Sequence, residues 1–314
     1  MAPENAESRD AQRIFLETAP LKETKRLASV HGCDIGIPND AGIGNILMYT
    51  RVVDDLAKLQ GRPLKILTGR LTPRIGVVDD EDPFPLWRND PFVDDIIDAD
   101  SIDPEIMVII NGERDNLCQF THMIENIAYH YGLRPRFLRP SLHLSGQEQS
   151  WALDKLRGLR RPVICLHPHG TSSPRPGHPW YEVNWRKLID RLGQFATVLE
   201  ILKVGTEAKQ LDTLKIPTNL RQMMSLVWAS DLFIGFDSSV AHIATAFELP
   251  SLVLWEPLLK VEIEESIQAG FAPAALSRWS YPQNRNLMLL GDRDDTIVNI
   301  ITDWANNVVE SLRT

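Results

Sequence analysis

The sequence is poor in cysteine and has no long apolar segment. Its three cysteines, Cys33, Cys118 and Cys165, are far apart and show neither Cys-x-x-Cys nor Cys/His ligand spacing. This pattern argues against a disulfide framework and a structural zinc site, and we expect no metal site. No apolar run reaches the roughly 18 residues that a membrane-spanning helix needs. The polar N-terminus also lacks the basic start and apolar core of a secretory signal. We therefore expect a cytoplasmic protein without a transmembrane anchor.

Positive charge is also scarce. The formal net charge is −9 over 314 residues. An acidic chain is repelled by phosphate backbones, so we predict no nucleic-acid partner. Several arginines do gather near the middle of the chain, and we interpret them as solvated side chains around a linker. The composition is 43% hydrophobic and 24% charged, which is typical of a globular protein with room for two domains.

Short β-branched runs alternate with helical patterns from about residue 30 onward. This alternation is typical of parallel sheets with crossover helices. In the first half we expect strands at Cys33–Ile37, Leu64–Thr68, Val93–Ile97 and Met107–Asn111, with helices at Gly44–Lys58 and Asn116–Tyr131. In the second half we expect strands at Pro162–Leu166, Thr197–Leu202, Leu232–Phe236, Ser251–Trp255 and Asn286–Leu290, with helices at Trp185–Leu192, Asn219–Ala229, Ser239–Glu248 and from Asp295 to Leu312.

A polar, proline-containing stretch at 133–149 is the best candidate for a domain boundary. We predict an N-terminal extension over 1–29, one Rossmann-like domain over 30–145, and a second over 146–314 that ends in a long helix. Ligands of such open sheets bind at the carboxyl ends of the strands. Candidate chemistry is therefore sought directly after each expected strand.

The first candidate follows the first expected strand, where Gly42 and Gly44 precede Asn45. Two nearby glycines let the backbone approach a ligand closely, beside the N–H groups of a helix N-terminus. The third glycine of a dinucleotide-binding fingerprint is missing. Asp40 is a candidate general base and Asn45 a candidate hydrogen-bonding group. The alternative is that this segment is only a turn and a helix cap.

The second candidate is the loop that begins at His167 and runs to Trp180. Gly170 has no side chain to cover its backbone, while Arg175 and His178 could donate hydrogen bonds to phosphate oxygens. Three histidines and an arginine in one loop favour a ligand site over a solvated turn, which is the alternative.

The third candidate is Asp237-Ser-Ser-Val-Ala-His242, between an apolar strand and a helix. Asp237 is a plausible N-cap, and Ser238 and Ser239 would join the first helical N–H groups in an anion site. His242 lies one turn further, on the same helix face as the serines. A core histidine with satisfied hydrogen bonds is the alternative interpretation of His242.

In this order the segments resemble the heptosyltransferases of glycosyltransferase family 9. The resemblance covers about residues 31–312 and is most specific in the C-terminal half. The motifs that carry it are His167-Pro-His-Gly170, Trp180-Tyr-Glu-Val-Asn-Trp185, Asp237–His242, the run at 249–257, Gly42-Ile-Gly-Asn45 and Asn89–Ile97.

The resemblance implies the α/β GT-B fold, two Rossmann-like parallel-sheet domains facing a cleft. It implies inverting, metal-independent transfer of a sugar, heptose being one candidate, from a nucleotide-diphosphate sugar to an acceptor hydroxyl. An ADP-sugar is favoured, GDP- and UDP-sugars stay open, and no further cofactor is expected. The acceptor is a glycolipid, a small metabolite or a protein. The implied donor-binding residues are His167, Gly170, Arg175, His178, Glu207, Asp237, Ser238, Ser239 and His242, and Gly42 and Gly44 fall on the acceptor side.

Three positions depart from the family pattern. The family's catalytic aspartate falls on Asn45, which cannot act as a base, so Asp40 becomes the candidate base. A lysine of the phosphate loop falls on His178, and the signature glycine falls on Ser239. These departures keep two alternatives open. One is a binding or scaffold protein on a decayed GT-B fold, and the other is a nucleotide-sugar epimerase.

Overall fold

The computed structural model describes residues 21–40, 42–71, 82–115, 122–168, 183–203, 211–255, 279–289 and 295–313. The chain divides into two compact units. The N-terminal unit comprises 1–75, 87–143 and 258–281, and the C-terminal unit comprises 76–86, 144–257 and 282–314. Each unit is described by itself below. Among the described residues, no helix is both long and apolar enough to cross a membrane.

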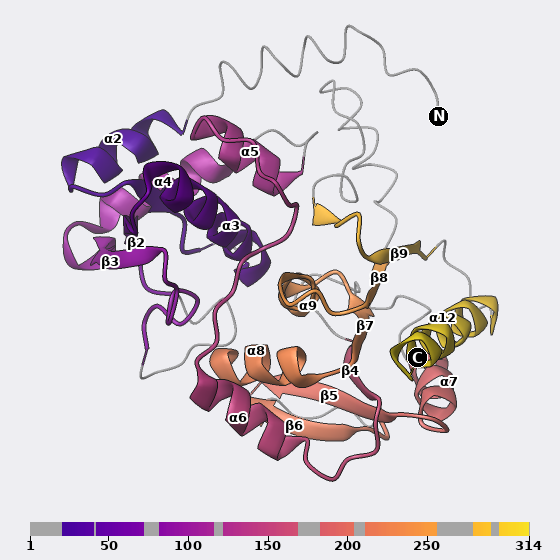
Figure 1. Cartoon of the computed structure of the whole chain (residues 1–314). Helices are drawn as coiled ribbons and strands as arrows, with labels where there is room; N and C mark the ends of the chain where they lie inside the picture. The colour runs from indigo at the N-terminus through magenta and orange to yellow at the C-terminus, as the bar shows by residue number, and fades with distance from the viewer. Residues whose placement is uncertain are drawn as a thin grey trace, which may run out of the picture. The chain divides into compact units, whose positions relative to one another are not determined.

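The N-terminal unit contains a three-stranded parallel sheet in the order β1-β2-β3. Strands β2 and β3 are labelled in Figure 1. The strands are β1 (Ile35–Ile37), β2 (Leu64–Thr68) and β3 (Val93–Asp98). Consecutive residues of β2, Ile66 and Leu67, have no solvent exposure. Since neighbouring side chains of a strand point to opposite faces, both faces of this sheet are covered.

Four longer helices surround this sheet. Helices α2 (Lys22–Val30) and α4 (Pro104–Asp115) share a core cluster with Leu67, and helix α3 (Ile43–Gln60) packs on β1, β2 and α5 (Met123–His130). The contact of α2 with β1 is very close, because a Cβ atom at Gly36 would lie 2.6 Å from Thr24 Cγ2. A short 3-10 turn, η2 (Ala99–Ser101), follows β3.

The C-terminal unit contains a six-stranded, all-parallel sheet in the order β6-β5-β4-β7-β8-β9. The chain builds outward from β4 in one direction and then returns to add β7 on the other side of β4. The strand order therefore reverses between β4 and β7. The strands are β4 (Val163–His167), β5 (Thr197–Lys203), β6 (Leu214–Thr218), β7 (Leu232–Phe236), β8 (Ser251–Trp255) and β9 (Arg285–Met288).

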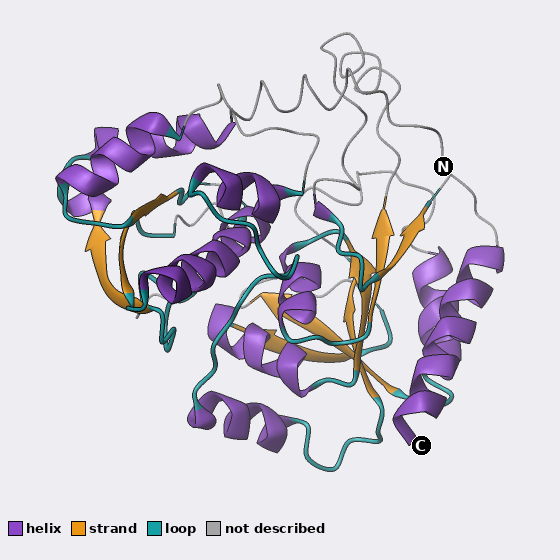
Figure 2. Ribbon diagram, turned by 45° about the horizontal axis from the view of Figure 1, so that its top comes forward, coloured by secondary structure: helices purple, strands orange, loops and turns teal. Residues whose placement is uncertain are grey.

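Helices lie on both sides of this larger sheet (Figure 2). Helices α7 (Val183–Leu192) and α12 (Asp295–Arg313) contact each other and share one core cluster with the strands. Trp185 is fully buried in this core cluster, and its ring lies edge-on to Phe236 with 5.8 Å between the ring centroids. Helices α6 (Gly146–Lys155), α8 (Leu220–Ala229) and α9 (Ser239–Ala246) form a second group.

Most expected elements are present within one to three residues, but some expectations were wrong. Met107–Asn111 belongs to α4 and is not a strand. The burial pattern gives the reason, because Met107 and Ile110 are buried while Val108 and Ile109 are exposed, which is a helical spacing. Helix α5 is shorter than expected and begins at Met123, and residues 116–121 lie outside the described part of the chain.

Helix α6 and strand β6 were not expected. Helix α2 lies partly in the predicted N-terminal extension, and α6 begins inside the polar stretch that we interpreted as a linker. Strand β6 carries Pro217, which is tolerated because β6 is an edge strand. Cys33 and Cys165 are buried free thiols, and burial raises the pKa of each.

A buried ion pair joins α6 to α8. Arg221, 2% exposed, donates from Nε to Glu148 Oε1 at 2.6 Å and from Nη2 to Oε2 at 2.7 Å, and its Nη1 donates to the carbonyl of Pro85 at 3.1 Å. Glu148 also accepts from the backbone N–H of Ser145 in a capping box at the start of α6. Although burial opposes it, these bonds from Arg221 and Ser145 hold the pKa of Glu148 below its usual value. The Glu148–Arg221 pair therefore connects three segments of the C-terminal unit: the start of α6, α8 and the stretch at Pro85.

We predict that Glu148→Gln destabilises the protein by about 3 kcal/mol, because it leaves the buried Arg221 charge without its partner. The control is Asp154→Asn on the same helix, whose partner Arg157 is largely exposed; this change should cost less than about 0.5 kcal/mol. Urea unfolding of both variants at pH 7 makes the measurement. Equal midpoints for the two variants would contradict the assignment.

Candidate functional site

The carboxyl ends of β4 and β7 meet at the point where the strand order of the larger sheet reverses. Open α/β sheets bind their ligands at such a position. Strand β4 ends at His167, which pairs in register with Gly235 of β7. The ring nitrogen Nδ1 of His167 lies 3.0 Å from Ser238 Oγ. The fold thus brings two of the candidate sequence motifs, 71 residues apart, into contact.

Gly235 allows this contact. A Cβ atom at this position would lie 2.6 Å from the carbonyl oxygen of His167 and 2.6 Å from Cζ of Phe233. Any larger residue would push the two strand ends apart. The same strand end is fixed on its other side, where the Asp237 N–H donates to the Leu254 carbonyl at 3.1 Å.

The start of α9 differs from our expectation in one respect. The N-cap residue is Ser238 and not Asp237, and the Ser238 side chain makes no capping hydrogen bond. Its hydroxyl instead faces His167. Ser239 is the first helical residue and is half-buried. The helix N-terminus carries partial positive charge, and the serine that could have capped it is engaged elsewhere.

Asp237 and His242 form a second polar pair at this helix. His242 Nε2 lies 3.9 Å from Asp237 Oδ1, and the His242 side chain is buried whereas that of Asp237 is 29% exposed. Partial burial reduces the solvation of the Asp237 carboxylate and raises the pKa of Asp237 to about 7. At neutral pH this carboxyl is therefore partly protonated, and its protonated form adds no negative charge beside a bound anion.

In the N-terminal unit, the expected residues lie around the start of α3. Asp40 is exposed in the turn after β1, and Gly42 is the N-cap of α3. Gly44 and Asn45 are half-buried in the first helical turn. The amide oxygen of Asn45 accepts a hydrogen bond from Trp279 Nε1 at 3.0 Å, so its side chain is held in place.

Four expected donor-binding residues, Gly170, Arg175, His178 and Glu207, lie outside the described residues.

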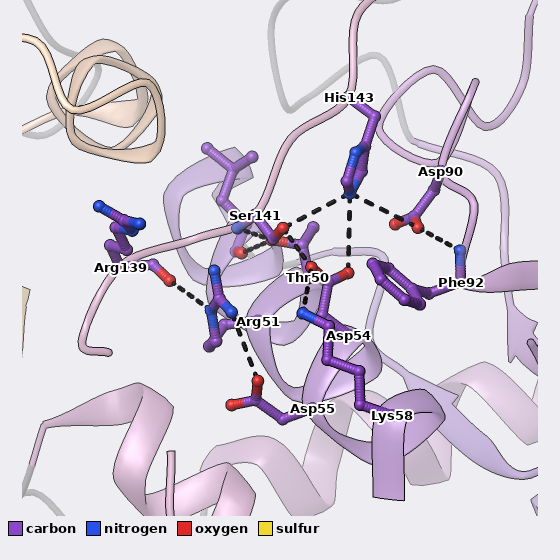
Figure 3. Close-up of polar contacts among 11 residues, drawn as sticks. Thr50, Arg51, Asp54, Asp55, Lys58, Asp90, Phe92, Arg139, Ser141 and His143 are labelled. Carbon is purple, nitrogen blue, oxygen red and sulfur yellow. Dashed lines mark hydrogen bonds and ion pairs between the residues drawn. The ribbon is translucent and has the colours of Figure 1, made fainter. Parts of the chain in front are cut away.

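A third polar group was missed by the sequence analysis. Asp54 on α3, Asp90 before β3 and His143 converge in the N-terminal unit (Figure 3). His143 Nε2 lies 3.7 Å from an oxygen of each carboxylate. The residues come from three separate segments, so no local spacing marks them. The one available signal is the pair of charged residues Arg51 and Asp54 within the long, largely apolar helical pattern of α3.

Burial and charge oppose each other in this group. Burial, together with the nearby Asp54 carboxylate, raises the pKa of Asp90 to about 6. Burial alone would lower the pKa of His143, but its interactions with the nearby Asp54 and Asp90 carboxylates outweigh burial and raise the pKa. The group therefore favours a positive charge at its centre.

Comparisons with known proteins agree with this architecture. The model of glycosyltransferase family 9 (heptosyltransferase) matches residues 127–264, which include β4, β7 and the start of α9. No curated protein matches this chain.

Several solved structures share the fold. ADP-heptose LPS heptosyltransferase II of E. coli matches 89% of this chain and 99% of its own, with 13% identity and a TM-score of 0.60. A family 9 glycosyltransferase of Veillonella parvula matches 85% and 88%, with 11% identity and a TM-score of 0.57. The E. coli heptosyltransferase WaaC, solved with ADP, matches 87% and 99%, with 11% identity and a TM-score of 0.54.

Two parallel-sheet units of this kind define the GT-B class of α/β proteins, which confirms the expected fold class. The family match over residues 127–264, together with the shared fold, supports a heptosyltransferase-like glycosyltransferase of family 9.

We predict that Asp237→Asn changes stability in a pH-dependent way. The folded-state pKa is about 7, well above the value of about 3.9 in an unfolded chain. The wild-type protein therefore loses stability as pH rises from about 4 through 7, because its buried acid must ionise. The Asn variant lacks this loss, so its melting temperature relative to wild type should rise between pH 5 and pH 8.

Exposed Asp212→Asn serves as the control and should show no such trend. A constant difference between Asp237→Asn and wild type across this pH range would contradict the raised pKa.

Proposed function

We propose that the protein transfers a sugar from a nucleotide-diphosphate sugar to an acceptor hydroxyl, with inversion and without a metal ion at the diphosphate. The observation that carries this proposal is the contact between His167 and Ser238 at the reversal of strand order, directly before α9. An ADP-sugar is the favoured donor. WaaC, which shares the fold, has been solved with ADP and with ADP-2-deoxy-2-fluoro heptose. Heptose is therefore one candidate sugar.

The diphosphate would bind at the N-terminus of α9. Backbone N–H groups and the helix dipole stabilise the negative charge that builds up on a leaving diphosphate. Ser238 and Ser239 would donate hydroxyl hydrogen bonds, and His167 would orient Ser238. Gly170, Arg175 and His178 are proposed to complete the phosphate contacts, and Glu207 to contact the nucleoside. Asp237 and His242 would contact the sugar.

The acceptor would bind at the N-terminal unit, next to Gly42 and Gly44. In a single displacement its hydroxyl oxygen attacks the anomeric carbon, the bond from that carbon to the diphosphate breaks, and a base removes the hydroxyl proton. Asp40 is the proposed base because it is an exposed carboxylate at the start of α3. Asn45 would position the acceptor. A glycolipid, a small metabolite and a protein are the acceptor classes.

A catalytically decayed scaffold is the second candidate. It is favoured by one observation, the hydrogen bond from Trp279 to Asn45. An amide held by an indole in the place of the family's catalytic aspartate supports a structural role for this position. A scaffold of this kind would bind no donor.

Donor binding separates the two candidates. We predict that ADP and an ADP-hexose raise the melting temperature more than the matching GDP and UDP compounds do. Ser238→Ala should weaken ADP binding about tenfold, because a hydrogen bond to a charged phosphate is worth about 1.5–3 kcal/mol. Ser311→Ala, an exposed serine of α12, is the control. Failure of all three nucleotides to bind would refute the donor site and support the scaffold.

The base assignment has its own test. We predict that Asp40→Asn lowers turnover at least 100-fold and leaves the affinity for ADP within twofold, because the base acts on the acceptor and not on the donor. Asp94→Asn removes another exposed carboxylate of the same unit and should leave turnover unchanged. Undiminished turnover in Asp40→Asn would show that another group removes the proton.

A further inference from the structure

The N-terminal unit holds a cluster of metal-ligating side chains that the proposed transfer reaction does not use. Asp54, Asp90 and His143 each offer one ligand atom, and these atoms all lie within 4.8 Å of one another. His143 Nε2 is 3.7 Å from Asp54 Oδ1 and 3.7 Å from Asp90 Oδ1. The hydroxyl of Ser141 lies 3.4 Å from the same ring nitrogen and donates to Asp54 Oδ2. Two carboxylates, an imidazole and a hydroxyl thus surround one point (Figure 3).

A second observation concerns Asp54. Its side chain is only 3% exposed, and its Oδ1 atom is buried without a hydrogen bond. This oxygen is the one nearest to His143. Lys58 approaches the other oxygen, Oδ2, at 3.9 Å, and its own side chain is 54% exposed. A buried carboxylate oxygen without a hydrogen bond carries a large desolvation cost, and a metal cation is one of the groups that offsets it.

Asp90 adds to this cost. Its side chain is 2% exposed and lies beside the Asp54 carboxylate. One oxygen of Asp90 accepts from the Phe92 N–H at 2.9 Å. Two nearly buried carboxylates around one imidazole carry more negative charge than a single protonated histidine neutralises. A doubly charged cation would balance both carboxylates, with the histidine neutral.

We propose that Asp54, Asp90 and His143 bind a divalent first-row transition-metal ion. Carboxylate and imidazole ligands together suit Zn²⁺ and Mn²⁺ better than Mg²⁺ or Ca²⁺, which prefer oxygen alone. Tetrahedral ligands at 2.0–2.1 Å from a zinc ion are about 3.3 Å apart. The two separations from His143, each 3.7 Å, therefore need to shrink by only a few tenths of an ångström, and the two carboxylate ligand atoms lie within 4.8 Å of each other.

The metal would fasten residues 139–143, which we call the strap, to α3. Three consecutive contacts already hold it there. Arg51 Nε donates to the Arg139 carbonyl at 3.1 Å, the Ser141 N–H donates to Thr50 Oγ1 at 2.9 Å, and the Ser141 hydroxyl donates to Asp54. The strap is the last part of the N-terminal unit before the chain enters the C-terminal unit at Leu144. We assign the ion a structural role, separate from donor binding, so this inference does not rest on the proposed function.

The test uses the tag-free, full-length protein after treatment with EDTA. Calorimetric titration with Zn²⁺ and, separately, Mn²⁺ should show one site per chain. Asp90→Asn and His143→Gln should each weaken binding at least tenfold. His31→Gln and Asp95→Asn replace an exposed or half-buried histidine and aspartate outside the cluster and should bind like wild type.

Thermal unfolding provides a second readout. Metal should raise the melting temperature of wild type and of both controls, but not that of the two cluster variants. If Asp90→Asn fails to fold, His143→Gln carries the test, because its side chain is 27% exposed and its loss leaves a smaller buried defect. Absence of stoichiometric binding to wild type, or equal affinity in wild type and His143→Gln, would overturn the proposal. The cluster would then be an ion-pair network with a protonated histidine.

Discussion

The parallel pairing of β4 with β7 is the constraint on which the C-terminal unit depends. It reverses the direction in which the sheet grows and places His167 level with Gly235. The missing side chain at Gly235 lets the two strand ends approach closely enough for the His167 ring to contact Ser238. The N-terminus of α9 begins at the same place, and we propose that it binds the anionic part of the donor.

The electrostatics of this site suit a diphosphate. A fixed aspartate charge beside the helix N-terminus would repel an anionic donor. The surroundings of Asp237 reduce this repulsion by raising its pKa toward neutrality, while its position near His242 keeps it able to hydrogen-bond. In the proposed complex, this carboxyl would contact the neutral sugar without repelling the phosphates. This division of roles agrees with the proposed placement of sugar and diphosphate at the two ends of one short segment.

In the N-terminal unit, Asn45 stands where the resemblance implies a catalytic aspartate, and a polar cluster lies in the interior. Asn45 is an amide held by Trp279, and the base that we propose is the exposed Asp40. Further along the same helix, Asp54 lies close to Asp90 and to His143 of the strap. Helix α3 therefore carries two polar positions with different environments, one near its exposed start and one in its buried middle.

Much of the fold could be predicted from local pattern, because parallel strands that are buried on both faces leave continuous apolar runs. The strands at Leu64–Thr68, Leu232–Phe236 and Ser251–Trp255 match the expected boundaries. The pattern failed in α4, where a short apolar run that belongs to a helix was interpreted as a strand. It also failed at β6, a short edge strand that contains a proline. Both errors come from packing that a short window of sequence does not contain.

The sequence by itself determined the α/β class, the order of segments and the motif from Asp237 to His242, because these depend on residues close together in the chain. Tertiary structure decided which distant residues share a site. It moved the N-cap from Asp237 to Ser238, joined Ser238 to His167, and brought Asp54, Asp90 and His143 together. Contacts between distant residues depend on how separate segments pack, and the spacing of residues along the chain does not encode the distances between those segments.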